Sequence, residues 1–125
     1  MQGAFPPAAK RARNAALAAR VKTIPLSSSI GVIWSAVAGA GGKLFLGTGS
    51  ALWVFEEDTK DGLLTLLAGH PSEEGFQDGQ GVEARFNIIT GLAMERDGSV
   101  LVSDKNNHCL RHVSQKPLRA ESLDG

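Results

Sequence analysis

The chain has 125 residues, the size of one domain with a modest hydrophobic core. Its 15 glycines and many short apolar runs favour an all-β fold. A single cysteine, Cys109, excludes an internal disulfide and suits a reducing compartment. There is no run of 18 apolar residues, so we expect no membrane-spanning helix.

The charged residues are unevenly distributed. Residues 1–25 contain Lys10, Arg11, Arg13, Arg20 and Lys22 and no acid, which gives a net charge of +5. The remaining residues contain eight bases and thirteen acids, a net charge of −5. A net-acidic body argues against a broad nucleic-acid-binding face, so nucleic acid is a disfavoured partner.

Residues 1–29 are expected to form a basic arm and a linker. Residues 8–22 are rich in alanine and arginine and follow two prolines, so a helix can begin there. Lys10, Arg11 and Arg13 are candidate interaction residues for nuclear import or a phosphate contact, whereas the alternative is a solvated terminal arm. A cytoplasmic or nuclear location is favoured, and the absence of acids in the arm leaves organelle import open.

From residue 30 onward the pattern changes to short strands. Strands are predicted at residues 31–38, 43–46, 51–57 and 63–67, with glycine-rich turns between them. Four strands in about 38 residues fit one four-stranded repeat unit. The glycine runs at 39–42 and 47–50 precede strands rather than helices, which favours hairpin turns over phosphate-binding loops.

Three more strands are predicted at residues 91–94, 100–103 and 109–113. Asp97-Gly98 predicts a tight primed turn between the first two, and residues 104–107 predict a second turn. Residues 41–46 align turn for turn with residues 97–102, which indicates an internal repeat.

This second unit resembles an NHL repeat, which forms one blade of a β-propeller. The residues that carry the resemblance are Phe86-Asn87, Gly91-Leu92-Ala93, Asp97-Gly98, Val100-Leu101-Val102, Ser103-Asp104, Asn107-His108 and Leu110-Arg111. Residues 68–69, 75–81 and 84–86 are similar to the inter-blade connection of that family. One departure is Ile89, which stands where the family usually has a proline.

The resemblance implies an all-β partial propeller of about two four-stranded antiparallel blades, the second of them incomplete. We expect a first blade at 30–68, an inter-blade connection at 69–89, a second blade at 90–113 and a tail at 114–125. The structural blade motif comprises Asp78, Gly79, Gly81, Phe86, Gly91, Asp97, Gly98, Asp104, Asn107, His108 and Arg111.

Asp104, His108 and Arg111 form the most suggestive polar set. In one interpretation His108 is a metal or ligand contact oriented by Asp104. In the other, which we favour, Asp104 caps the turn and pairs with His108 or Arg111 for architecture alone. The three histidines show no metal-ligand spacing, and Ser103 lacks a nucleophile elbow, so no metal, cofactor or catalytic residue is predicted.

Several remaining residues are expected to serve packing. The loop at 78–81 lacks the regular oxygen spacing of a calcium site, and we interpret it as a turn that lets Phe76 and Phe86 pack beneath the blade. Trp34 and Trp53 are expected to pack within the blades rather than to serve as binding platforms, although an exposed tryptophan would be a hot-spot candidate for binding. Cys109 is expected to be a small core residue.

The function predicted from the resemblance is a non-catalytic protein-interaction module or a fragment of a larger NHL propeller scaffold. Two blades leave apolar faces uncovered, so the partner is a protein or the remaining blades of a propeller, and self-association is a further outcome. The arrangement also resembles the N-terminal part of an algal BTB/POZ-type propeller protein. The alternatives are a piece of a metal-dependent propeller hydrolase or lyase, and an RNA-binding NHL protein that uses the basic arm.

Overall fold

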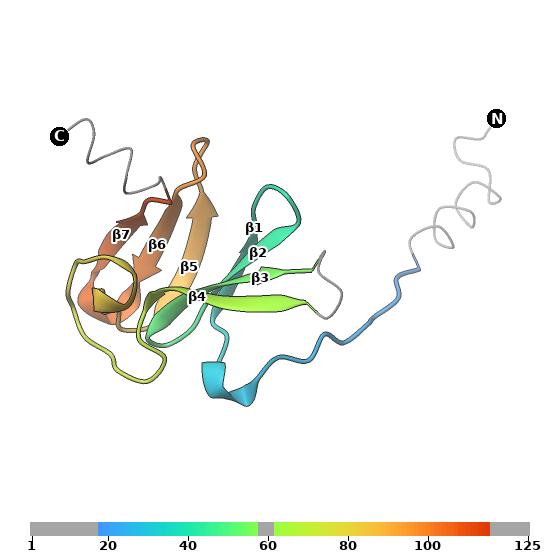
Figure 1. Ribbon diagram of the computed structural model, residues 1–125, viewed down its shortest axis with the longest axis horizontal. Helices are drawn as coiled ribbons and strands as arrows, with labels where there is room; N and C mark the ends of the chain where they lie inside the picture. Colours follow the sequence, from blue (N-terminus) through green and yellow to red (C-terminus); the bar gives the residue numbers. More distant parts are fainter. Residues whose placement is uncertain (1–17, 58–61, 116–125) are drawn as a thin grey trace, which may run out of the picture.

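Figure 1 shows two β-sheets that lie side by side in the computed structural model, which describes residues 18–57 and 62–115. The first sheet has four strands and the second has three, and all neighbouring strands are antiparallel. The all-β prediction is therefore confirmed, and the sheets are consistent with two neighbouring propeller blades of which the second is incomplete. Among the described residues, no helix is long and apolar enough to cross a bilayer.

The first sheet follows chain order. It contains β1 (Ser35–Ala38), β2 (Lys43–Gly47), β3 (Ala51–Glu56) and β4 (Leu63–Gly69), and a short 3-10 helix, η1 (Ser28–Ile30), precedes it. The central strand β3 is buried from its first residue to its fifth, which explains its continuous apolar sequence. Both faces of the first sheet are therefore covered by other parts of the chain at β3.

The second sheet contains β5 (Ile89–Met94), β6 (Val100–Asp104) and β7 (Cys109–Val113). The 3-10 helix η2 (Gly81–Glu83) lies in the connection between the sheets, and η3 (Lys105–Asn107) joins β6 to β7. Burial alternates along β6, where Val100, Val102 and Asp104 are buried and the residues between them are half-buried. One face of the second sheet therefore points into the molecule.

The N-terminal part differs from the sequence-based prediction. The first strand begins at Ser35 rather than at residue 31, because η1 ends at Ile30 and the next residue, Gly31, has a φ of 83° that redirects the backbone. Residues 18–22 have no helical structure, so the predicted helix is wrong there. Its other residues lie outside the part of the chain that the structure describes.

The hairpin between β5 and β6 lies at the position predicted from Asp97-Gly98, but its turn is not of the predicted primed type. The Gly98 N–H donates to the Glu95 carbonyl at 3.0 Å, and Gly98 has a φ of 90°. A two-residue primed turn on Asp97-Gly98 would require a positive φ at Asp97, which has none. The primed-turn prediction is therefore wrong, and the turn ends on a left-handed glycine that leads into β6.

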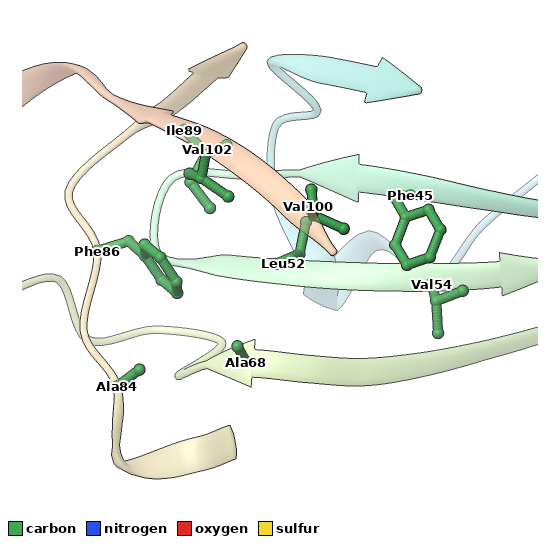
Figure 2. Close-up of a cluster of buried hydrophobic side chains, with 9 residues drawn as sticks. All are labelled: Phe45, Leu52, Val54, Ala68, Ala84, Phe86, Ile89, Val100 and Val102. Atoms are coloured by element: carbon green, nitrogen blue, oxygen red, sulfur yellow. The ribbon is translucent and has the colours of Figure 1, made fainter. Parts of the chain in front are cut away.

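The main hydrophobic core lies between the two sheets (Figure 2). Its buried members come from both sheets and from their connection, and they are Phe45, Leu52, Val54, Ala68, Ala84, Phe86, Ile89, Val100 and Val102. Removing this apolar surface from water stabilises the contact between the sheets. The two sheets and the connection therefore fold around one shared core.

A second cluster covers the opposite face of the first sheet. It contains Ile30, Leu46, Ala51, Trp53 and Phe55. The indole N–H of Trp53 donates to the Thr48 hydroxyl at 3.2 Å, so its polar atom is satisfied in the buried site. Trp53 thus packs as expected, whereas Trp34 is 49% exposed and the packing prediction is wrong for it.

Strand β2 of the first sheet and strand β5 of the second approach closely at Gly47. A Cβ atom built on Gly47 would lie 2.4 Å from Cγ2 of Ile89, well inside van der Waals contact. The Ser35 hydroxyl also donates to the Ile89 carbonyl at 3.2 Å. Gly47 therefore sets how close β2 comes to β5.

Ile88 precedes β5 in an unusual conformation, with a φ of 70°. A β-branched side chain rarely adopts the left-handed region, so this backbone is strained. The strain is held by two hydrogen bonds: the Ile88 N–H donates to the Gly49 carbonyl at 2.6 Å, and the Lys105 N–H donates to the Ile88 carbonyl at 2.9 Å. Ile88 thus links the β2–β3 turn to η3.

Candidate functional site

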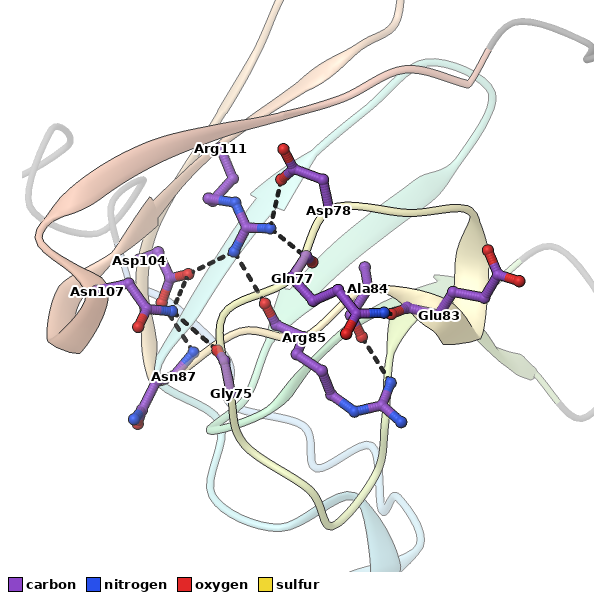
Figure 3. A network of polar contacts seen from close by, with 10 residues as sticks. All are labelled: Gly75, Gln77, Asp78, Glu83, Ala84, Arg85, Asn87, Asp104, Asn107 and Arg111. Carbon is purple, nitrogen blue, oxygen red and sulfur yellow. Dashed lines mark hydrogen bonds and ion pairs between the residues drawn. The ribbon is translucent and has the colours of Figure 1, made fainter.

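Two of the three predicted polar residues, Asp104 and Arg111, meet at the end of β6 together with Asn107 (Figure 3). Asp104 is fully buried, and its Oδ2 accepts hydrogen bonds from Arg111 Nη1 and Asn107 Nδ2, each at 2.8 Å. Its Oδ1 accepts a hydrogen bond from the Asn87 backbone N–H, also at 2.8 Å. The carboxylate is therefore satisfied by three donors from three segments, as a buried charge requires.

Arg111, on β7, lies at the centre of the network. Its Nη1 also donates to the Arg85 carbonyl, and its Nη2 donates to the Gln77 carbonyl and to Asp78 Oδ1. Burial alone lowers the pKa of Arg111, but the hydrogen bonds and charges of Asp78 and Asp104 outweigh burial and raise that pKa. The guanidinium is therefore a permanent cation that ties β7 to the inter-sheet connection.

Two aromatic rings enclose this guanidinium. Its central carbon lies 4.9 Å from the ring centroid of Phe86 and 5.1 Å from that of Phe76. Phe86 is buried, but Phe76 is 67% exposed, so the prediction that Phe76 packs beneath the blade is wrong. Phe76 instead covers Arg111 from the solvent side.

The same network fixes the inter-sheet connection. The amide of Asn107 donates to the Gly75 carbonyl at 2.9 Å, and Gln77 and Arg85 form an isolated antiparallel bridge. The guanidinium of Arg85 donates to the Val82 and Ala84 carbonyls. Residues 75–86 therefore form a closed loop that hydrogen bonds hold against the second sheet.

His108 does not join the Asp104 cluster. It is exposed and lies in the left-handed region with a φ of 57°, directly before β7. Asp104 makes no side-chain cap to η3 and pairs with Arg111 rather than with His108. His112 lies 2.8 Å from Glu95, and His70 lies 3.8 Å from Glu73. Within residues 18–57 and 62–115, no three His, Cys, Asp or Glu side chains gather as metal ligands.

The other predicted motif residues lie in turns and strands around this network. Asp97 Oδ1 accepts a hydrogen bond from the Ser99 N–H at 2.9 Å. A Cβ on Gly79 would lie 2.9 Å from Cβ of Glu83, and Gly81 opens η2 with a φ of 50°. Gly91 lies in β5 opposite Ser103. Lys10, Arg11 and Arg13 lie outside the described residues.

Three contributors to the network, Gln77, Arg85 and Asn87, were recognised from the sequence as parts of the repeat and its connection but were not predicted as site residues. Gln77 and Arg85 act largely through backbone carbonyls, which no side-chain pattern reveals, and Asn87 acts through its N–H. Cys109, expected in the core, is half-buried and pairs with Asp104 in the β6–β7 register. The sequence signal for Gln77, Arg85 and Asn87 was their place within the stretches that resemble the repeat and its connection.

An opening of about 620 Å³ lies beside this network. Its wall includes Asp78, Gln80, Phe86, Leu110 and Arg111. Asp78 and Arg111, two of the residues at this wall, are bonded to each other at 2.8 Å. Both groups are therefore already engaged in an ion pair.

Comparisons with known proteins identify one repeat within the chain. Residues 86–113 match the NHL repeat family. The chain is also similar to Protein SUPPRESSOR OF QUENCHING 1, chloroplastic, from Arabidopsis thaliana, with 41% identity over 58 residues. That match covers 46% of this chain and 6% of the relative's length. No solved structure matches the chain significantly. Residues 86–113, which contain the Asp104–Arg111 pair, are therefore an NHL repeat.

Proposed function

We propose that this chain is a non-catalytic protein-interaction module of the propeller type. The proposal rests on one observation: the polar groups of the Asp104–Arg111 network are all engaged in contacts within the fold. Its acid and base are hydrogen-bonded to each other and to the connecting loop. Because these groups are already hydrogen-bonded within the fold, the network supports a rigid scaffold. The network offers no free acid, base or nucleophile to a substrate.

The loops at one end of the sheets are well suited to present a binding surface. The β2–β3 turn is tied to the connection because the Ile88 N–H donates to Gly49 and the His70 N–H donates to Ser50. Loops fixed in advance lose little entropy when a partner binds. We infer that these loops, rather than the strands, contact a protein partner.

The proposal is tested by capturing proteins on the full-length chain and then measuring each purified candidate by calorimetry. A true partner is expected to bind with fixed stoichiometry and to slow hydrogen exchange at residues 48–50 and 70–88. The proposal fails if candidates bind a chemically unfolded sample of the chain as well as they bind the folded chain.

Two rival functions remain testable with the same protein. Stoichiometric, tightly held metal in the purified chain would favour the metal-dependent enzyme. RNA binding would depend on the basic arm, so removal of residues 1–22 should abolish it. Either result would replace the interaction module as the leading function.

The location of the chain is a separate proposal. The name of the Arabidopsis relative places that protein in the chloroplast. The arm at residues 1–25 has five bases and no acid, a composition that fits organelle import. A fusion of residues 1–29 to a fluorescent protein is expected to enter the organelle, and a diffuse cytoplasmic signal would contradict this.

A further inference from the structure

A second cavity, of about 310 Å³, lies away from the Asp104–Arg111 network. It is formed where the segment before β1, the β2–β3 turn and the loop after β4 meet. Its wall has an apolar part, which includes Val32, Trp34 and Pro71, and a polar part, which includes Ser50 and Glu74. None of these five residues belongs to the polar network described above.

Trp34 is the most unusual part of the apolar wall. Its side chain is 49% exposed, in contrast to the buried Trp53. The Trp34 backbone is fixed nonetheless, because its N–H donates to the Gly47 carbonyl at 2.9 Å. A large aromatic side chain on a fixed backbone, with half of its surface open, provides a contact platform at little entropic cost.

Glu74 differs from its neighbour Glu73. The carboxylate of Glu73 is engaged, with Oε1 3.2 Å from Arg85 and Oε2 3.8 Å from His70. Glu74 has no ion pair or hydrogen bond with any other residue in the described ranges. Its Oε2 would lie 3.6 Å from a Cβ on Gly49, so the carboxylate lies close to the β2–β3 turn. Glu74 therefore brings an unpaired negative charge to the cavity.

Ser50 provides a second, independent observation at this cavity. It is only 5% exposed, and its position is fixed by the hydrogen bond from the His70 N–H to its carbonyl. Yet the Ser50 hydroxyl has no hydrogen-bond partner among the residues that the structure describes. Because the Ser50 hydroxyl forms no hydrogen bond with these residues, it is available to a donor group that enters the cavity.

We propose that this cavity binds a lysine or arginine side chain from an extended basic segment of a partner protein. The alkyl stem and the charged head would pack on the Trp34 ring, and the N–H groups would donate to Glu74 and Ser50. The charge balance agrees, because residues 26–125 carry a net charge of −5. The inference rests on the proposed function and adds the chemical class of the partner.

Indole N–H signals in an NMR spectrum of the full-length chain provide a direct test. The probe is a synthetic hexapeptide, Gly-Ala-Lys-Arg-Ala-Gly, and its control has glutamate in place of lysine and arginine. Since the chain has two tryptophans, we expect the probe to shift the Trp34 indole signal and to leave that of Trp53 unchanged. A shift of both signals, or of neither, would overturn the proposal.

Neighbouring carboxylates provide matched variants. Glu74→Gln removes the charge and keeps the shape, and it is expected to weaken peptide binding about tenfold. Glu73→Gln is the control, and its affinity should stay within about twofold, because Glu73 is already engaged with Arg85. Equal effects of the two substitutions would contradict a specific role for Glu74.

The alternative occupant is the basic arm of the chain itself. Removal of residues 1–22 should leave the peptide affinity unchanged if the site is free for a partner. A large gain in affinity would show that the arm fills the cavity and would overturn the assignment to a partner. If the peptide does not bind but a protein partner still binds the chain through another surface, this cavity is rejected as the site. The proposal that the chain is an interaction module would be unaffected by that result.

Discussion

The carboxylate of Asp104 and the guanidinium of Arg111 form a buried ion pair, with Oδ2 2.8 Å from Nη1. The pair joins the end of β6 to the middle of β7, across the η3 turn. Because Arg111 also donates to the Gln77 and Arg85 carbonyls, it links the hairpin to the inter-sheet connection. The stability of the second sheet and that of the connection are therefore coupled.

The first prediction concerns the loss of the Asp104 charge. Asp104→Asn leaves the buried Arg111 without its main counter-ion and should lower the free energy of unfolding by about 3 kcal/mol. Urea denaturation followed by circular dichroism measures the change. The control is Asp78→Asn, which should cost less than about 1 kcal/mol because the Asp78 side chain is 95% exposed.

The second prediction concerns the shape of Arg111. Arg111→Lys keeps the charge but cannot reach four acceptors with a planar fork, so we expect a loss of about 2 kcal/mol in the same assay. Hydrogen exchange should become faster at residues 75–86 as well as in β7. Faster exchange in β7 alone would show that Arg111 does not hold the connection.

The third prediction concerns pH. The pKa of Arg111 is raised because the hydrogen bonds and charges of Asp78 and Asp104 outweigh the lowering effect of burial. A raised pKa gives stability that is fully present below the unfolded pKa and is lost only as pH rises through the folded pKa. The difference in unfolding free energy between wild type and an Arg111→Met variant should therefore be the same at pH 7 and pH 9. A decline toward pH 9 would contradict this assignment.

The fourth prediction concerns the strained backbone at Ile88. Ile88→Asn should raise the free energy of unfolding by about 1 kcal/mol, because asparagine tolerates a positive φ better than a β-branched residue does. Thermal denaturation is a suitable measurement. The neighbouring change Ile89→Asn should instead be destabilising by about 3 kcal/mol, since Ile89 is fully buried.

The fifth prediction concerns the contact between β2 and β5 at Gly47. Gly47→Ala places a methyl group 2.4 Å from Ile89 Cγ2 and should cost about 2 kcal/mol as the two sheets move apart. Gly91→Ala is the matched control, because its Cβ would meet Ser103 at 3.4 Å, close to ordinary contact. Similar losses for both variants would show that the cost comes from strand propensity rather than from this approach.

Much of the sheet structure could be predicted from the sequence. The strand at β7 has the predicted bounds, and the other strands differ from prediction by a few residues, because glycine-bearing turns separate short apolar runs. The start of β1 was predicted four residues too early, since Val32 and Ile33 have strand-like sequence but remain exposed before Ser35. Strand propensity does not reveal whether a neighbouring strand is present, and in the described residues the pairing of β1 with β2 begins only at Ser35.

The candidate site was predictable only in part. Asp104, Asn107 and Arg111 were identified, but their partners Gly75, Gln77 and Arg85 contribute backbone carbonyls that lie 26 to 34 residues from the side chains they bind. Such contacts depend on the path of the connection in space, which side-chain patterns do not encode. The exposed Trp34 was missed for the same reason, because burial depends on what packs against a residue.

The second sheet ends at β7, and within the described residues no strand pairs with the outer edge of β7. Leu110 on this strand is 66% exposed, so an apolar side chain lies next to free backbone groups. Open edges of this kind template fibril growth when the protein is concentrated. A lysine at position 110 would act as a gatekeeper there, and samples of the Leu110→Lys variant should withstand higher concentrations before precipitating.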